Sequence, residues 1–175
     1  MNAEQRDEQF RLIVLPHLAD ALAFARYLTG SRDDGEDVVQ EACLRALAGI
    51  GTYAGGSAKA WLLAIVRNAC FTWLAKHRPK SLVLTADPTE LADGADPGEA
   101  APTPEAQLIA RADSETVTAA IAGLPGLFRE VVVLRDINGM SYREIAAMIG
   151  IPMGTVMSRL ARARRLLAIR LADTR

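Results

Sequence analysis

The sequence contains little of what metal sites, disulfide scaffolds and membrane spans require. It has two cysteines, two histidines and an aromatic content of 5% in 175 residues. Cys43 and Cys70 each lie in an apolar helical pattern with no second cysteine or histidine at ligand spacing, so we interpret both as small buried side chains and expect no metal or cofactor. No stretch reaches the about 18 uninterrupted apolar residues of a membrane span. We therefore expect a cytoplasmic protein without membrane insertion.

The composition is that of a globular protein, and its charge is unevenly distributed. Half of the residues are hydrophobic and 23% are charged, which is enough apolar surface to form a core. The formal net charge of −1 conceals three parts: +1 over residues 1–80, −7 over 81–115 and +5 over 116–175. The net charge alone therefore hides a basic module beside an acidic segment.

The acidic middle part reads as a linker between two helical domains. Residues 85–106, TADPTELADGADPGEAAPTPEA, combine prolines, glycines and carboxylates with almost no large apolar side chain, so burial cannot offset the entropy of ordering. We predict an all-α protein with a helical bundle in residues 1–80, a flexible acidic linker in 81–106, and a four-helix domain containing a helix-turn-helix in 107–175.

The amino-terminal part predicts three helices. The first, from Pro16, ends at Gly30, where a helix commonly terminates. The second opens with Asp33 and Glu36 at the spacing of a capping box and runs to Ile50. A glycine-bearing loop follows, and a third helix over residues 60–77 stops before Pro79. Alternating strand patterns of useful length are absent.

The carboxy-terminal part predicts two helices and then a helix-turn-helix. SYREIAAMIG, residues 141–150, is a short helix with Ser141 and Glu144 as a capping box. A glycine-containing turn leads to a long helix that begins after Pro152. Apolar residues recur at the spacing of a helix-turn-helix core, at Ile145, Ala146, Ile149, Val156 and Leu160.

The long last helix carries five arginines within residues 158–170. Its apolar stripe should face the core. The outward face should then consist of Thr155, Ser158, Arg159 and Arg162. A recognition helix presents such a face to the major groove, where arginine binds guanine edges. We expect the flanking Arg164, Arg165 and Arg170 to meet phosphates. A merely solvated basic face is the alternative, disfavoured because the arginines coincide with a helix-turn-helix.

These motifs resemble a known family. DDGEDVVQEACLRAL (33–47), AWLLAIVRNACFTWL (60–74) and LPGLFREVVVLRDINGMSYREIAAMIGIPMGTVMSRLARARRLL (124–167) are similar, in order and separation, to the extracytoplasmic-function (group IV) sigma factors of bacterial RNA polymerase, within the sigma-70 family. The resemblance covers nearly the whole chain except its first residues and the linker. It implies a promoter-recognition subunit and not an enzyme.

The resemblance also implies roles for individual residues. In the family, the first motif binds the polymerase's largest subunit, which assigns this role to Asp37, Gln40 and Glu41, with Leu44 and Leu47 as apolar support. The loop and third helix handle the downstream promoter element as the strands separate, which points to Tyr53, Ser57, Lys59, Arg67, Asn68, Lys76 and Arg78. The resemblance assigns recognition of the upstream promoter element to Thr155, Ser158, Arg159, Arg162 and Arg165. We interpret Trp61, which could wedge against DNA, as a core residue.

The same resemblance predicts the partners. They are core RNA polymerase, promoter DNA in duplex and melted form, and an anti-sigma protein that holds the factor inactive until a stress or envelope signal. We expect a monomer when free. Two alternatives remain at this stage: a stand-alone helix-turn-helix regulator, and an enzyme using the carboxylates of residues 33–41. The latter is disfavoured because no histidine or lysine lies near them.

Overall fold

The computed structural model describes residues 1–77, 104, 105, 107 and 114–174, and within these residues every regular element is a helix. The chain divides into two compact units, Met1–Leu82 and Val83–Arg175. The predicted all-α class with two helical domains is confirmed. The predicted acidic linker lies almost wholly outside the described residues, as do Arg78 and Pro79.

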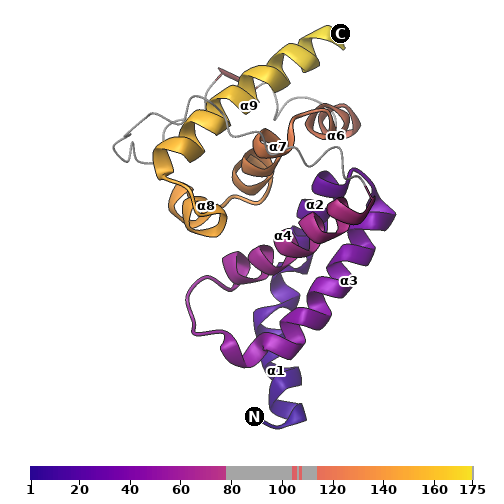
Figure 1. The fold of residues 1–175 in the computed structure, drawn as a ribbon, viewed down its shortest axis with the longest axis vertical. Coiled ribbons are helices and arrows are strands. Elements are labelled where there is room, and N and C mark those ends of the chain that lie inside the picture. Colours follow the sequence, from indigo (N-terminus) through magenta and orange to yellow (C-terminus); the bar gives the residue numbers. More distant parts are fainter. Residues whose placement is uncertain (78–103, 106, 108–113, 175) are drawn as a thin grey trace. The chain divides into compact units, whose positions relative to one another are not determined.

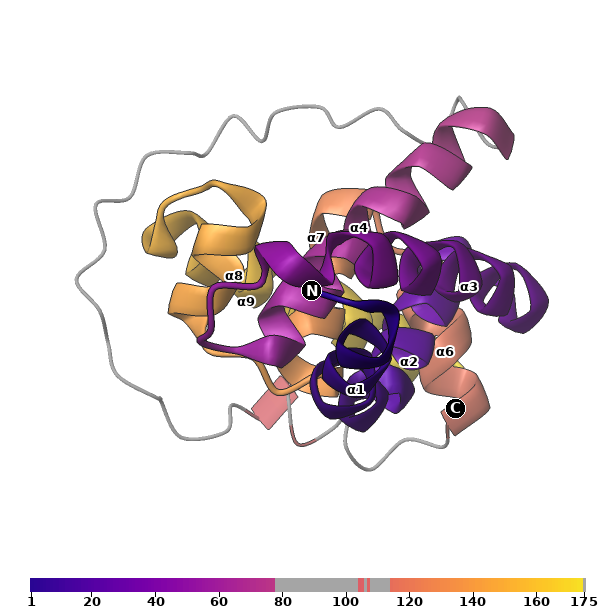
Figure 2. The same ribbon diagram turned by 90° about the horizontal axis from the view of Figure 1, so that it is seen from below.

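The amino-terminal unit is a bundle around three helices, α2 (Leu18–Thr29), α3 (Arg32–Gly49) and α4 (Ala58–His77). Each packs against the other two (Figures 1 and 2). Before them lie α1 (Ala3–Ile13) and η1 (Leu15–His17), and η2 (Ile50–Thr52) follows α3. The sequence patterns had not indicated α1, although Asn2 and Gln5 cap it reciprocally. The largest fully buried side chains of this unit are Phe24, Leu28, Ile50, Leu62 and Leu63.

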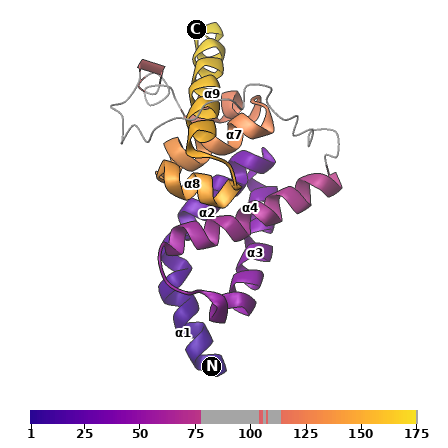
Figure 3. The same ribbon diagram turned by 60° about the vertical axis from the view of Figure 1, so that its left-hand side comes forward.

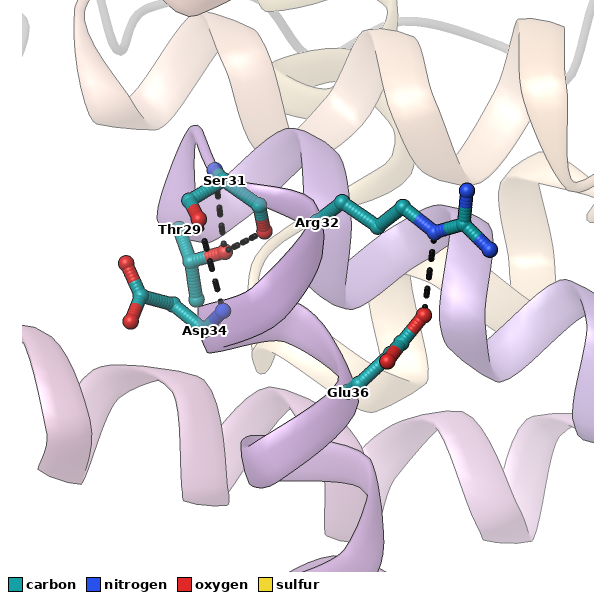
Figure 4. A network of polar contacts seen from close by, with 5 residues as sticks. All are labelled: Thr29, Ser31, Arg32, Asp34 and Glu36. Carbon is teal, nitrogen blue, oxygen red and sulfur yellow. Dashed lines mark hydrogen bonds and ion pairs between the residues drawn. The ribbon is translucent and has the colours of Figure 1, made fainter.

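The turn between α2 and α3 is fixed by glycine and by side-chain caps. Gly30 ends α2 as predicted, with a φ of 76° in the left-handed region. The predicted capping box of Asp33 and Glu36 is wrong, because α3 begins two residues earlier: Ser31 is the N-cap and accepts from the Asp34 amide at 3.4 Å (Figure 4). Glu36 instead forms an ion pair with Arg32 at 3.0 Å.

The apolar character of α2 reflects its place in the bundle. One stretch of the described residues, Ala3–Thr29, has the length and hydropathy of a membrane span, and the core helix of a soluble protein has the same properties. Here Phe24, Ala25 and Leu28 of α2 are buried among the helices of the unit. Of the apolar window in this stretch 33% is buried, and α1 contributes no buried residue to it.

The carboxy-terminal unit consists of α6 (Ser114–Ala122), α7 (Gly126–Val132), the π-helical η4 (Val133–Ile137), α8 (Tyr142–Ile149) and α9 (Met153–Asp173). The long α9 packs against α6, α7 and α8, with α8 near its amino-terminal end (Figure 3). The capping box of Ser141 and Glu144 is present as predicted, and Gly150 ends α8 at a φ of 79°. Because this tight turn joins α8 to α9, the two form the predicted helix-turn-helix.

The buried stripe of α9 matches the predicted one. Val156, Leu160, Ala163, Leu167 and Leu171 are at most 5% exposed. They meet an apolar run in α7 and η4, where Val131, Val132, Val133 and Leu134 are fully buried. Arg129 closes the preceding helix end, since its Nη2 donates to the carbonyls of Ala122 at 2.7 Å and Leu124 at 2.9 Å. Ile149, expected in the core, is only half-buried.

Gly35 marks the closest approach of α2 and α3. A Cβ at this position would lie 2.8 Å from the Arg26 backbone nitrogen and 2.9 Å from its Cα. Replacing Gly35 with alanine should lower the free energy of unfolding by about 1–3 kcal/mol, because backbone atoms must move apart. This exceeds the about 1 kcal/mol that alanine adds through helix propensity. Urea denaturation followed by circular dichroism measures the difference.

Gly49, at the other end of α3, is the matched control for this substitution. A Cβ there would meet only the Thr52 hydroxyl, at 3.8 Å. Gly49→Ala should therefore leave stability unchanged or raise it. A Gly35→Ala variant as stable as Gly49→Ala would contradict the close packing.

Candidate functional site

Helix α3 presents an acidic and apolar face to solvent. Its buried side consists of Gly35, Val38, Val39, Ala42 and Ala46. On the opposite side, Asp37, Gln40, Glu41 and Leu44 are exposed, and Leu47 is half-buried. Their spacing of three and four residues places them on one stripe of the helix. Leu44 is 65% exposed, so a large apolar side chain stands in water among polar ones.

A shallow cleft lies beside this face, between α3 and α4. Its volume is about 320 Å³, and it is lined by Asp37, Val38, Glu41, Arg45, Ala69, Thr72, Trp73, Lys76 and His77. The Trp73 and His77 rings stack with centroids 4.4 Å apart. On the α4 side of this cleft, Lys76 had been expected to contact DNA, whereas Ala69 and Trp73, which lie on the same helix face, had no predicted role.

The loop before α4 is held in a defined shape. Gly55 and Gly56 have φ values of 93° and 87°. The Tyr53 hydroxyl donates to the Gly56 carbonyl at 2.7 Å, and its ring meets Trp61 edge-on at 5.5 Å. Trp61 is thus half-buried against this loop and is not the core residue expected. Ser57 caps α4 by accepting from the Ala60 amide at 3.1 Å.

The residues predicted to contact the downstream element do not all share one surface. Asn68 is exposed, and the Arg67 guanidinium lies 4.8 Å from the centre of the Phe71 ring. Lys59 forms an ion pair with Asp20 of α2 at 3.3 Å. Nine residues separate Arg67 from Lys76, which is about half a rotation from it around the helix. Lys76 therefore lies in the cleft facing α3, away from Arg67.

The predicted outward face of α9 requires a correction. Thr155 is 6% exposed and Arg159 is 5% exposed, so both are buried. Three residues advance an α-helix by about 300°, which leaves Arg159 about 60° from Val156 in the core stripe. Ser158 is half-buried, and Arg165 is exposed on the side opposite the stripe.

The remaining arginines of α9 differ in their surroundings. Arg162 lies over the Phe128 ring, 5.5 Å from its centre. Arg164 forms a bidentate pair with Asp136, with Nε–Oδ2 at 3.0 Å and Nη2–Oδ1 at 2.6 Å. Hydrogen bonding to the Asp136 carboxylate raises the pKa of the Arg164 guanidinium. Arg164 is thus committed to a carboxylate of its own unit, whereas Arg165 and Arg170 are exposed.

The cysteines show no metal-binding arrangement. Both are free thiols; Cys70 is buried, whereas Cys43 is only partly buried. Burial raises the pKa of the Cys43 thiol, which disfavours the thiolate. Within the described ranges, histidine, cysteine and carboxylate side chains nowhere gather in the groups of three that could hold a metal ion.

A helix-turn-helix with a basic last helix defines this protein as a DNA-binding transcription protein. A second helical unit with an exposed acidic face accompanies it. The family model "Sigma-70 region 2" matches residues 13–80, and "Sigma-70, region 4" matches residues 114–167. The chain belongs to the sigma-70 family, in its extracytoplasmic-function branch.

Relatives of established name share most of the chain. The RNA polymerase sigma-H factor of Pseudomonas aeruginosa is 32% identical over 158 residues, covering 89% of this chain and 82% of the relative. The ECF sigma factor EcfG of Rhodopseudomonas palustris is 35% identical, with 86% and 78% covered. The ECF sigma-E factor of Escherichia coli K12 is 34% identical, with 75% and 70% covered.

A solved structure is similar over the full length. It is the sigma factor RpoE of Bartonella quintana in complex with the anti-sigma factor NepR, with a TM-score of 0.69 and 29% identity over 97% of this chain and 98% of that one. The protein is therefore a sigma factor, which binds core RNA polymerase and directs promoter-specific initiation, and is not an enzyme. The stand-alone regulator is excluded by the match to region 2.

Burial predicts opposite effects for two arginines of α9. Arg165→Ala should change the free energy of unfolding by less than about 0.5 kcal/mol, because the side chain is exposed. It should lower the slope of log affinity against log salt by about 0.9, the loss of one phosphate contact. Arg159→Ala should lower the free energy of unfolding by about 1–3 kcal/mol, since it removes the packing of a side chain that is 5% exposed.

Urea denaturation of the full chain measures the first quantity for both variants. Anisotropy titrations of the holoenzyme on promoter DNA, at several salt concentrations, measure the second. The assignment is contradicted if Arg159→Ala is as stable as the unmodified protein, or if Arg165→Ala keeps the full salt slope.

Proposed function

We propose that the exposed face of α3 binds core RNA polymerase through Asp37, Gln40, Glu41, Leu44 and Leu47. The observation that carries this proposal is Leu44, 65% exposed within a row of polar side chains. An apolar side chain rimmed by polar groups is typical of a protein–protein contact, where its burial contributes to affinity. This proposal concerns the amino-terminal domain, residues 1–80.

The chemistry of this face indicates a basic helical partner. Asp37 and Glu41 are one turn apart, so their carboxylates can accept from arginines of one partner helix. Glu41 is paired with Arg45 at 3.0 Å, but both side chains are about half exposed, and such pairs contribute little in water. Replacing the Glu41–Arg45 pair by a bond from Glu41 to a partner arginine therefore costs little free energy. Asp33, Asp34 and Glu36 lie at the start of α3, where they favour the helix dipole.

Replacing Gln40 and Glu41 together with alanine should weaken binding to core polymerase by about 2 kcal/mol or more, the loss expected of a central contact. Glu41→Lys should weaken it further, because it places like charges together. Fluorescence anisotropy of the labelled full chain with purified core polymerase measures both affinities.

Glu8→Ala is the matched control, since it removes an exposed carboxylate of α1, outside the proposed face. It should bind core polymerase as the unmodified chain does. The proposal fails if the double variant remains folded by circular dichroism and binds with unchanged affinity.

The downstream element is assigned to the loop and the outward side of α4. Tyr53 and Ser57 shape the loop, and Asn68 offers an amide for a base edge. Lys59 and Arg67 supply positive charge at the two ends of this surface. Lys76 faces the cleft beside α3, so it can contact the downstream element only from the edge of this surface. Arg78 is retained from the family resemblance alone.

The upstream element is assigned to the helix-turn-helix domain, residues 107–175. Ser158 and Arg165 lie on the side of α9 away from the core, which supports contacts to DNA. Arg162 lies on a flank and Thr155 and Arg159 are buried, so we assign these three to the edge of the interface and to support of the helix. Base readout then depends on fewer residues than the arginine spacing predicted.

Regulation by an anti-sigma protein completes the proposal. The structurally similar RpoE was solved with its anti-sigma factor NepR, and sigma-E factors are among the relatives. We expect this factor to act on polymerase in the cytoplasm, as a monomer when free, and to be released in a stress or envelope response. Affinity capture with the full chain from its own cells, before and after stress, identifies such a partner.

A further inference from the structure

An ion pair joins two segments of the carboxy-terminal unit that are far apart in sequence. The Asp136 carboxylate accepts from Arg164 through two bonds, of 3.0 and 2.6 Å, across 28 residues. The two side chains are only 16% and 14% exposed. A planar guanidinium bound to both carboxylate oxygens has one preferred orientation, so the pair is directional as well as attractive.

Asp136 occupies an unusual segment of backbone. It lies in the π-helical η4, where the Asn138 amide bonds to the Val133 carbonyl at 2.9 Å, five residues back. The extra residue in this turn changes the direction in which later side chains leave the helix. The neighbouring Arg135 donates to the Met140 carbonyl at 2.8 Å and lies over the Tyr142 ring at 4.7 Å. The segment that leads into α8 is therefore held by the Asn138–Val133 bond and by the contacts of Arg135 with Met140 and Tyr142.

The core packing of α9 selects which face of the helix is buried, and the ion pair adds an oriented bond to that packing. Val156, Leu160 and Leu167 pack through apolar contacts, which are non-directional. Base contacts need side chains placed within about 0.5 Å and 10–20°. Arg164 lies one turn beyond Leu160 on α9, so an oriented bond there sets the rotation of the recognition helix.

We propose that Asp136 and Arg164 are positioning residues for promoter recognition: their bidentate pair sets the orientation of α9, and Arg164 does not contact phosphate. The proposal rests on the assignment of α9 to the upstream element. On this proposal, Asp136 and Arg164 contribute to sequence specificity although neither contacts a base. Arg164 is then not among the arginines that contact DNA.

The test uses full-length variants assembled with core polymerase. Two duplexes serve as probes: one carries the upstream element that the unmodified holoenzyme selects from a randomised pool, and the other carries the same bases scrambled. Affinity is measured for both at several salt concentrations, and the ratio of the two affinities is the specificity. Thermal unfolding of each variant is recorded so that every titration is made on folded protein.

Asp136→Asn and Arg164→Gln should each lower the specificity ratio by about tenfold, the discrimination of one well-placed base contact. The double variant should be no worse than Arg164→Gln, because that substitution already removes the pair with Asp136. The salt slope on scrambled DNA should stay unchanged. Arg164→Lys keeps the charge but loses the fork, so it should behave like Arg164→Gln.

Arg165→Ala is the matched control, an exposed arginine adjacent in the same helix. It should lower the salt slope by about 0.9 and leave the ratio unchanged, as one lost phosphate contact requires. The opposite pattern at Arg164 overturns the proposal: a lower slope for Arg164→Gln, a normal ratio for Arg164→Lys, and unimpaired specificity for Asp136→Asn. Equal losses on both duplexes in the Asp136 and Arg164 variants also overturn it, because they indicate only a less stable domain. If the unmodified holoenzyme selects no upstream element, the assignment of α9 itself is what fails.

Discussion

The burial of one apolar face on α3 and on α9 is the constraint on which both units depend. A domain of this size can cover only one side of a helix, so the other side must remain in water. In α3 the covered side holds Val38 and Ala42, which leaves Asp37, Glu41 and Leu44 outside. In α9 the covered side holds Val156 and Leu160, and Arg165 is left outside. Formation of the core therefore also determines which side chains α3 and α9 expose.

Small residues set how closely those faces approach. Gly35 lets the start of α3 reach the backbone of α2, where even a methyl group would be too close. Ala42 and Ala46 continue the same side of α3. A rigid helix pair of this kind would hold the proposed docking face of α3 in one shape before a partner arrives, which lowers the entropy cost of binding.

Arginine serves two purposes in the carboxy-terminal unit, and only one of them is contact with DNA. Arg129 closes the end of α6, Arg135 holds the segment before α8, and Arg164 binds Asp136. All three make hydrogen bonds within the unit, and the two-nitrogen fork of Arg164 is one that lysine cannot reproduce. The positive charge of this unit is thus partly internal, and the count of arginines overstates how many can meet phosphate.

Local patterns determined much of this protein from sequence alone. Helical periodicity, the stops at Gly30 and Gly150 and the capping box of Ser141 depend on residues a few positions apart, so they could be read from the sequence. The residues of the exposed stripe of α3 were expected from the family resemblance and not from periodicity. Tertiary structure alone decided which arginines are available: Arg159 is buried, Arg164 is held by a carboxylate 28 residues away, and Lys76 faces α3. These outcomes depend on which helices pack together and on the π-turn at Asp136. Spacing within a single helix carries no information about a partner that approaches from another.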